Sequence, residues 1–256
     1  MLILLSCAKT MAVTSKIEIP ATVPQYLERA KDIAFQMSQY SVDELEQILK
    51  VNAKIALQNY QLFQSFHSEE NSPLQAILAY TGIVFKRLGV KDFSTEDFYY
   101  TQEHLRLTSF CYGLLRPFDL IKNYRMEGDI VLPELGDITI FDYWKPILTD
   151  AFITAIKRNG GVLVYLASGE MKLLFDWKRV EEEVNVITPE FRVNRNGELK
   201  TIVIYTKMCR GEMARFILKN KLEAPESLKS FTFDGFSFRQ ELSDEHNYLF
   251  TIFDVV

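Results

Sequence analysis

Cysteine and histidine are scarce in this sequence, with three residues of each among 256. Cys7, Cys111 and Cys209 lie far apart, no C-x-x-C occurs, and the histidines show no metal-ligand spacing with one another or with cysteine. These absences argue against a disulfide framework and a zinc knuckle, and they suit a reducing compartment. We therefore expect a cytoplasmic protein with no metal and no cofactor.

Long apolar runs are also missing, since none approaches the roughly 20 residues that a membrane helix needs. The opening residues 1–6 are apolar but short, and Lys9 follows almost at once, so they indicate a buried first strand rather than a signal peptide. The sequence contains no G-x-G-x-x-G, G-x-x-x-x-G-K-[ST], G-x-S-x-G or H-E-x-x-H. We expect no membrane partner and none of these common catalytic or cofactor sites.

An excess of positive charge is the third absence, because the formal net charge is -5. A generally basic nucleic-acid binder is thereby excluded, and any contact with nucleic acid needs a local basic patch. The hydrophobic fraction of 48% and the charged fraction of 25% are ordinary for a globular protein. A chain of this size can bury a core without disulfides or metal.

Helical and strand patterns alternate from end to end. Apolar spacing predicts helices over 24–39, 53–66 and 141–158, and strands over 2–5, 162–167, 231–238 and 248–253. No internal repeat, low-complexity segment or linker divides the chain. We predict an α/β fold, namely a single mixed-sheet domain over residues 1–256 with surrounding helices.

Two local patterns give sharper predictions. A capping motif at Ser94 starts a helix that we expect to continue through Leu107 towards Gly113, and Arg116-Pro117 then opens a new helical turn. The turn residues 194–197 predict a hairpin between strands 184–193 and 199–205, with a helix following over 208–220.

Five short polar motifs lie where buried elements are expected to end: 6–10, 102–106 with 112–119, 124–127, 166–170 and 205–211. Loops at the carboxyl ends of strands are where α/β proteins place ligands. The candidate phosphate ligands are Lys9, Arg106, Arg116, Arg125, Lys207 and Arg210. Glu127 and Glu170 are the candidate acid–base residues.

Each motif also has a structural interpretation. Lys9 suits a surface lysine, Arg116 a salt bridge in a tight corner, and Ser168 a helix N-cap, while Arg125 and Glu127 could pair with each other. Four of the five motifs carry Lys or Arg, which favours one shared site. We predict that five cations converge on one cleft: Lys9, Arg116, Arg125, Lys207 and Arg210.

These motifs together resemble the peroxide-stress protein YaaA family. The resemblance is carried by the opening residues 1–6 with Ala8-Lys-Thr10, Gln75 through Gly82, His104-Leu-Arg106 through Arg116-Pro117, Tyr124-Arg125 with Glu127, Trp144, Leu166-Ala-Ser168, and Lys207 with Arg210-Gly211 and Arg215-Phe-Ile217. It implies a cytosolic role in surviving hydrogen peroxide, a link to limiting free iron, and a positively charged cleft that binds double-stranded DNA. It also implies a helix-hairpin-helix element, which by position would span residues 102–120. Cys7 replaces the family's proline, and Phe110-Cys111 stands where a small glycine is expected.

Two functions compete. The first is a DNA-binding stress protein without catalysis. The second is an enzyme that acts on a nucleotide or nucleic acid by glycosidic-bond chemistry, with Glu170 or Glu127 as general acid or base. A carboxylate among cations in a deep pocket would favour the enzyme, because DNA repels carboxylates, whereas an open groove one duplex wide would favour the binder. A third possibility is an interaction protein whose polar motifs only stabilise its own fold.

Overall fold

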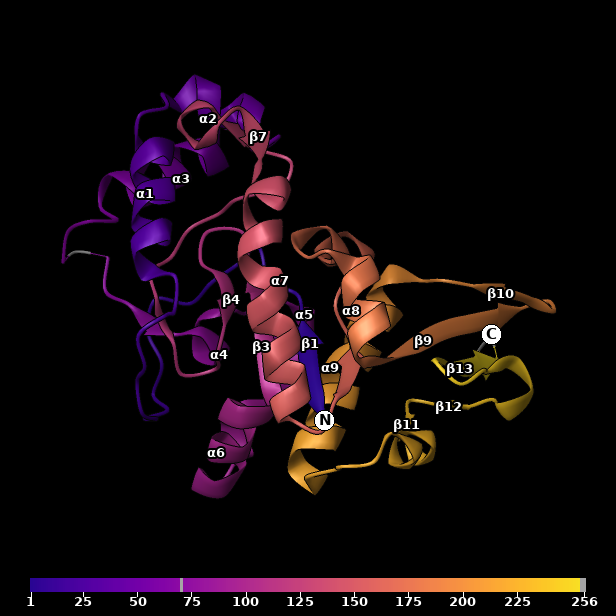
Figure 1. Cartoon of the computed structure of the whole chain (residues 1–256). Coiled ribbons are helices and arrows are strands. Elements are labelled where there is room, and N and C mark those ends of the chain that lie inside the picture. The colour runs from indigo at the N-terminus through magenta and orange to yellow at the C-terminus, as the bar shows by residue number, and fades with distance from the viewer. Residues whose placement is uncertain (70, 254–256) are drawn as a thin grey trace.

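A mixed sheet with helices around it forms the framework of the molecule (Figure 1). The computed structural model describes residues 1–69 and 71–253. The helices are α1 (Leu27–Ser38), α2 (Val42–Ile48), α3 (Ala53–Gln64), α4 (Ala76–Ala79), α5 (Ile83–Leu88), α6 (Thr95–His104), α7 (Ile140–Arg158), α8 (Trp177–Glu183) and α9 (Val203–Asn220). Short 3-10 turns are η1 (Val90–Asp92), η2 (Pro133–Leu135), η3 (Gly169–Leu174), η4 (Pro225–Ser230) and η5 (Gln240–Leu242).

Nine strands of the described residues build the main sheet, in the order β11-β12-β13-β9-β8-β1-β3-β4 with β10 beside β9. Their bounds are β1 (Leu2–Leu5), β3 (Leu105–Ser109), β4 (Gly113–Leu115), β8 (Val162–Tyr165), β9 (Asn185–Arg195), β10 (Glu198–Lys200), β11 (Thr232–Phe233), β12 (Phe236–Phe238) and β13 (Asn247–Phe253). Two small pairs lie apart: β2 (Leu74–Gln75) with β5 (Leu120–Ile121), and β6 (Val131–Leu132) with β7 (Ile138–Thr139). The expected α/β fold with a mixed sheet and surrounding helices is confirmed.

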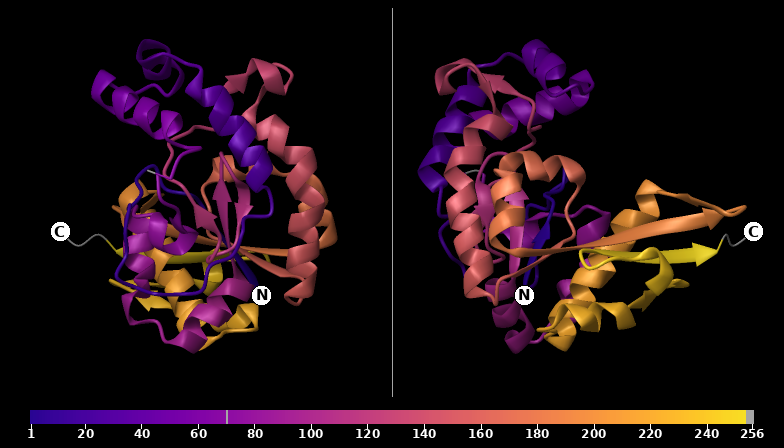
Figure 2. Two further views of the ribbon diagram at one scale, coloured as in Figure 1. Left: turned by 90° about the vertical axis from the view of Figure 1, so that its left-hand side faces the viewer. Right: turned by 45° about the vertical axis from the view of Figure 1, so that its right-hand side comes forward.

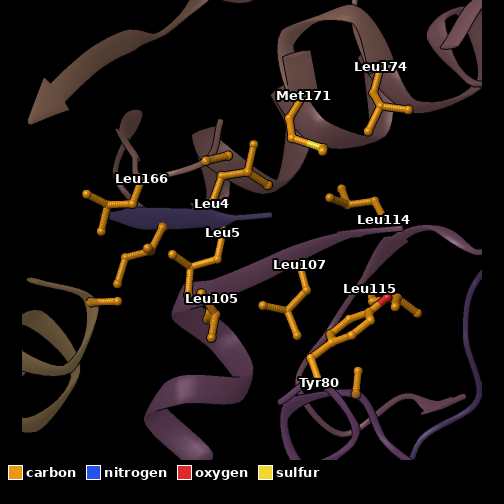
Figure 3. Packing of buried hydrophobic residues seen from close by; sticks show 14 of the residues in the cluster. Leu4, Leu5, Tyr80, Leu105, Leu107, Leu114, Leu115, Leu166, Met171 and Leu174 are labelled. Atoms are coloured by element: carbon orange, nitrogen blue, oxygen red, sulfur yellow. The ribbon is translucent and has the colours of Figure 1, made fainter. Parts of the chain in front are cut away.

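Strand β1 lies between β3 and β8 and runs parallel to both. All four of its residues are buried, which explains why its sequence is a continuous apolar run. Figure 3 shows Leu4 and Leu5 packed among Leu105, Leu107 and Leu166 from the neighbouring segments. Because β1, β3 and β8 are parallel, their carboxyl ends meet at one edge of the sheet, where α/β folds place ligands.

The remaining strands extend to one side. Strands β9 and β13 pair in parallel over seven residues, and with β10 they project away from the helices α1–α3 (Figures 1 and 2). Helix α7 packs against β4 and β8, whereas α9 packs against β9 and α5. No helix of the described residues is both long and apolar enough to cross a membrane.

The predicted helix-hairpin-helix element is not confirmed, because helix α6 ends at His104. It starts after Ser94 with the expected capping box. Residues 105–109 then form β3, whose Leu105 and Leu107 pair with Ile3 and Leu5 of β1. Gly113, with φ of 74°, begins strand β4 instead of closing a helix. The buried edge of β1 needs a hydrogen-bonding partner, and this requirement overrides the helical pattern.

The second correction concerns the hairpin and helix near the carboxyl end. The turn at Asn196 and Gly197 forms as expected, with φ of 54° and 87°. Strand β10, however, ends at Lys200, and α9 begins at Val203 rather than at residue 208. Lys207 and Arg210 consequently lie inside α9, almost one turn apart, and not at a junction between strand and helix.

Candidate functional site

A cavity of about 410 Å³ opens at the carboxyl ends of β1 and β8. We call it the polar cleft. Its polar lining comprises Ser6, Cys7, Lys9, Thr10, Tyr124, Arg125, Glu127, Ser168, Glu170, Lys207 and Arg210, and residues 82–85 form part of its wall. The structure therefore brings together Lys9, Arg125, Lys207 and Arg210 with both candidate carboxylates, from segments far apart in the sequence.

Hydrogen bonds tie the loop after β1 to the loop after β8. The Ser168 backbone N–H donates to Ser6 Oγ at 2.8 Å, and the two hydroxyl oxygens lie 3.2 Å apart. The Ser168 hydroxyl also donates to Glu170 Oε1 at 3.3 Å. Ser168 stands at the N-cap position of η3, as expected, but its side chain makes no capping hydrogen bond to that 3-10 turn. Its bonds instead fix the loop that carries Glu170.

Glu127 faces the cations of the cleft. Its Oε1 accepts a hydrogen bond from Lys9 Nζ at 2.7 Å and lies 4.0 Å from Arg125 Nη2. Its side chain is 17% exposed, whereas that of Lys9 is 62% exposed. The segment that carries Arg125 and Glu127 has no regular secondary structure. The Glu127 carboxylate is thus mostly buried and lies between two cations, Lys9 and Arg125.

Two arginines present buried nitrogens to this region without a partner. Among the described residues, the Nε atoms of Arg125 and Arg210 are buried and have no hydrogen-bond acceptor. Burial lowers the pKa of Arg210, and Tyr165 partly opposes that shift. A guanidinium N–H without an acceptor is costly to bury. Both side chains line the polar cleft, where a charge-assisted hydrogen bond from either guanidinium group to an anion would offset part of this cost.

Close packing of α9 on α5 positions Lys207 and Arg210. A Cβ on Gly211 would lie 2.3 Å from the Val84 carbonyl oxygen and 2.7 Å from Arg87 Cβ, so only glycine allows this crossing. A Cβ on Gly82 would approach Ala8 Cβ to 3.1 Å. These two glycines hold the wall of residues 82–85 against both the loop after β1 and helix α9.

The floor of the cleft is neutral. The Cys7 backbone N–H donates to Thr108 Oγ1 at 3.2 Å, and burial raises the pKa of the Cys7 thiol to about 12, with Glu170 and Glu127 adding to the rise. The Tyr124 hydroxyl lies 2.7 Å from that of Tyr80 and 2.6 Å from Ser109 Oγ. Burial raises the pKa of Tyr124 well above its usual range. A reactive thiolate is thereby excluded from the floor.

Arg116 and Arg106 do not join the polar cleft. Arg116 Nη2 donates to Asp119 Oδ1 at 2.9 Å and to the Val23 carbonyl at 3.0 Å. Asp119 is 1% exposed, so the salt-bridge interpretation of Arg116 is the one that the geometry matches. Arg106 donates to the backbone carbonyls of Gln102 and Leu105 at 3.0 and 2.8 Å. The predicted convergence therefore holds for four cations and is wrong for Arg116.

Sequence reasoning missed the wall of residues 82–85 and gave Tyr124 no role. Gly82 was a possible signal, because a glycine between apolar residues marks a close approach of two backbones. No cluster of three His, Cys, Asp or Glu side chains within residues 1–69 and 71–253 has the arrangement of a metal site.

Comparisons with known proteins show where this chain belongs. The family model described as "Peroxide stress protein YaaA" matches residues 1–242. A UPF0246 protein of Bacteroides thetaiotaomicron is 64% identical over 251 residues, which cover 98% of each chain. UPF0246 proteins of Porphyromonas gingivalis and Clostridium beijerinckii are 46% and 38% identical, over 98% of this chain and 100% and 97% of their own. The resemblance seen in the sequence is confirmed: the chain belongs to the peroxide stress protein YaaA family, and this membership supports a role related to oxidative stress.

Proposed function

We propose that this protein acts in the response to hydrogen peroxide by binding double-stranded DNA, with one phosphate held in the polar cleft by Arg125 and Arg210. The observation that carries the proposal is the pair of buried Nε atoms without acceptors. Phosphate oxygens accept several charge-assisted hydrogen bonds at once, which is what two guanidinium groups at one cavity require.

Local charge supports an anionic ligand. Four cations and two carboxylates line the cleft of a chain whose formal net charge is -5. Lys9 and Lys207 are exposed, so they can meet DNA first, whereas Arg125 and Arg210 are mostly covered. The net negative charge of the whole molecule repels DNA at long range, so the local patch must supply the binding free energy.

The proposal places the protein in the cytoplasm, together with the DNA. It includes a link to limiting free iron, since iron(II) converts peroxide into radicals that damage DNA. Family membership supports the peroxide part of this function.

Titrating a labelled duplex at several salt concentrations tests the proposal. Arg125 and Arg210 share one phosphate, and Lys9 and Lys207 each meet another, so three phosphate contacts predict that log affinity falls with log salt at a slope of about -2.7. Arg210→Met should weaken binding to all sequences alike, because a phosphate contact carries no base information. The slope should flatten by less than about 0.9, because Arg125 still contacts the same phosphate. Lys54→Gln removes a charge from an exposed position on α3, outside the cleft, and serves as the control. Absence of duplex binding at low salt would refute the proposal.

A second candidate function, hydrolysis of an N-glycosidic bond, is favoured by one observation. Glu127 and Glu170 lie among cations in a cleft of nucleotide size, and phosphate binding alone gives no reason for two carboxylates there. In this reaction a carboxylic acid protonates the leaving base, the C–N bond breaks, and water supplies the hydroxyl at C1′. A carboxylate can serve as the base that takes the proton from that water.

Chromatography for free base after incubation with nucleoside monophosphates and oligonucleotides tests this candidate. Release that is lost in both Glu127→Gln and Glu170→Gln, while phosphate binding persists, would establish it. Release that both variants retain would assign the activity to other residues or to a contaminant.

A further inference from the structure

Strand β10 has an open edge. It pairs with β9 on one side, and no other strand of the described residues pairs with it on the other side. Together with β9 it forms the outer part of the region that projects away from helices α1–α3 (Figures 1 and 2). An open edge carries unpaired N–H and C=O groups, to which a second strand can hydrogen-bond. The proposed function makes no use of this edge.

The register of β9 shows which backbone groups of β10 are free. The Thr188 N–H donates to the His246 carbonyl, at the start of β13, at 2.7 Å. Because backbone groups alternate along a strand, the even-numbered residues of β9 face β13 and the odd-numbered residues near its end face β10. Leu199 lies opposite Asn194, an even-numbered residue. The N–H and C=O of Leu199 therefore point away from β9, towards the open edge.

The turn before β10 leads to the same alignment. Asn196 and Gly197 have φ of 54° and 87°, as in the two-residue turn of a tight hairpin. The residues that flank such a turn, Arg195 and Glu198, form a hydrogen-bonded pair, and the next pair along the hairpin is not hydrogen-bonded. That next pair contains Leu199. Two separate features thus leave the backbone of Leu199 available to a further strand.

Opposite charges flank Leu199. Glu198 and Lys200 are both exposed, and Lys200 Nζ lies 3.0 Å from Glu198 Oε2. Charged side chains normally protect a strand edge from unwanted pairing. A copy of the same strand is an exception, because a two-fold antiparallel alignment centred on Leu199 places Glu198 of each copy opposite Lys200 of the other. The charges therefore favour a second copy of β10 over strands of other sequence.

Apolar side chains lie beside this edge. Leu199 is only partly buried, and Val203 and Ile204 in the first turn of α9 are exposed. In the two-fold alignment, Leu199 of one copy lies beside Leu199 of the other. The same alignment brings the turn at residues 196–197 of one copy alongside residues 201–202 of the other, directly before the two exposed apolar residues. Pairing would thus remove apolar surface from water.

We propose that two copies of this chain associate through β10, with the Leu199 N–H of each copy donating to the Leu199 carbonyl of the other. The main sheet of one copy then continues into that of its partner, and ion pairs between Glu198 and Lys200 form on both sides of the two-fold axis. The interface is short, so the association is weak and depends on concentration. It does not depend on the proposed binding of DNA, because none of its residues lines the polar cleft.

Sedimentation velocity over a range of protein concentrations tests the inference. Wild type should form a dimer whose fraction rises with concentration. Lys200→Glu places four carboxylates around the axis, and Glu198→Lys places four ammonium groups there, so each variant alone should self-associate at least about tenfold more weakly. An equimolar mixture of the two variants should form a heterodimer, because every ion pair across the axis is restored. Lys54→Glu, at an exposed position on α3, is the matched control and should self-associate like wild type.

The possible outcomes either support or overturn pairing through β10. A wild-type protein that stays monomeric at about 1 mM overturns it. Self-association that Lys200→Glu leaves unchanged also overturns it, because the dimer would then use another surface. If neither variant self-associates, a mixture that stays monomeric overturns the inference as well. A heterodimer in that mixture confirms the inference and shows that both variants are folded.

Discussion

Lys9 Nζ lies 2.7 Å from Glu127 Oε1, although 118 positions separate the two residues. The exposed lysine thus has its charge balanced by a less exposed carboxylate. A phosphate that reaches Lys9 must compete with Glu127, and the carboxylate repels it.

Replacing Glu127 with Gln should therefore strengthen binding of phosphate-containing ligands. We expect roughly a tenfold gain in affinity, because a like charge beside the ligand is removed and Lys9 is released. Titration of a nucleoside monophosphate measures this gain. Glu182→Gln, on the exposed surface of α8, is the control and should change affinity little. A loss of affinity in Glu127→Gln would mean that Glu127 itself contacts the ligand.

Arg210→Met should change stability and binding in opposite directions. Methionine fills the buried volume without an Nε that lacks an acceptor, so the free energy of unfolding should stay unchanged or rise by about 1 kcal/mol. Affinity for phosphate should fall. Urea unfolding and ligand titration on the same preparation measure both effects. A variant destabilised by several kcal/mol would show that Arg210 supports the fold.

Arg116→Ala should lower the stability of the protein and leave its affinity for DNA unchanged. It leaves buried Asp119 without its guanidinium partner, which should cost about 2 kcal/mol of stability. Asp119 still accepts hydrogen bonds from the Thr22 hydroxyl and the residue 116 N–H, which limits the cost. Affinity for DNA should not change. A weakened affinity with unchanged stability would restore the DNA-contact role first considered for Arg116.

Gly211→Ala should destabilise the protein by about 1–3 kcal/mol, because the new methyl group would overlap the Val84 carbonyl. It should also weaken phosphate binding, since α9 must shift with Lys207 and Arg210. Gly169→Ala is the matched control, because a Cβ there meets nothing within 4 Å. Thermal unfolding and titration of both variants distinguish a local clash from a general intolerance of alanine.

The cysteines should not act as peroxide sensors. Burial raises the pKa of both Cys7 and Cys209 to about 12, and Cys111 is fully buried. At pH 7 the reactive thiolate is therefore a negligible fraction of each. Mass spectrometry after mild peroxide should find no sulfenic acid in the folded protein, whereas the urea-unfolded chain should be oxidised. Stoichiometric oxidation of any one cysteine in the folded state would contradict this.

The elements that the sequence predicts well are those with local causes. Residues 2–5 form a buried strand because every side chain is apolar, and Ser94 starts α6 because its hydroxyl caps the first turn. The end of α6 has no such local cause. Leu105 and Leu107 fit a helix or a strand, and the choice is made by β1, a segment about 100 positions earlier.

The candidate site likewise contains residues whose positions the sequence predicts and residues whose positions depend on distant segments. The positions of Lys9 and Ser168 follow from the rule that parallel strands end at one edge of a sheet. Arg116 resembles them in sequence, but its guanidinium group forms a salt bridge with Asp119, three residues away. The contribution of residues 82–85 depends on two glycine contacts between distant segments, and one sequence alone does not reveal such contacts.

The position of β1 between β3 and β8 has a consequence for synthesis. The first strand leaves the ribosome about 100 residues before β3 and about 160 before β8, so neither edge of its apolar segment can pair early. Until then the nascent chain carries an unpaired hydrophobic strand, which exposes it to aggregation and slows its folding. The amino terminus of the nascent chain therefore stays prone to association until both β3 and β8 have been translated.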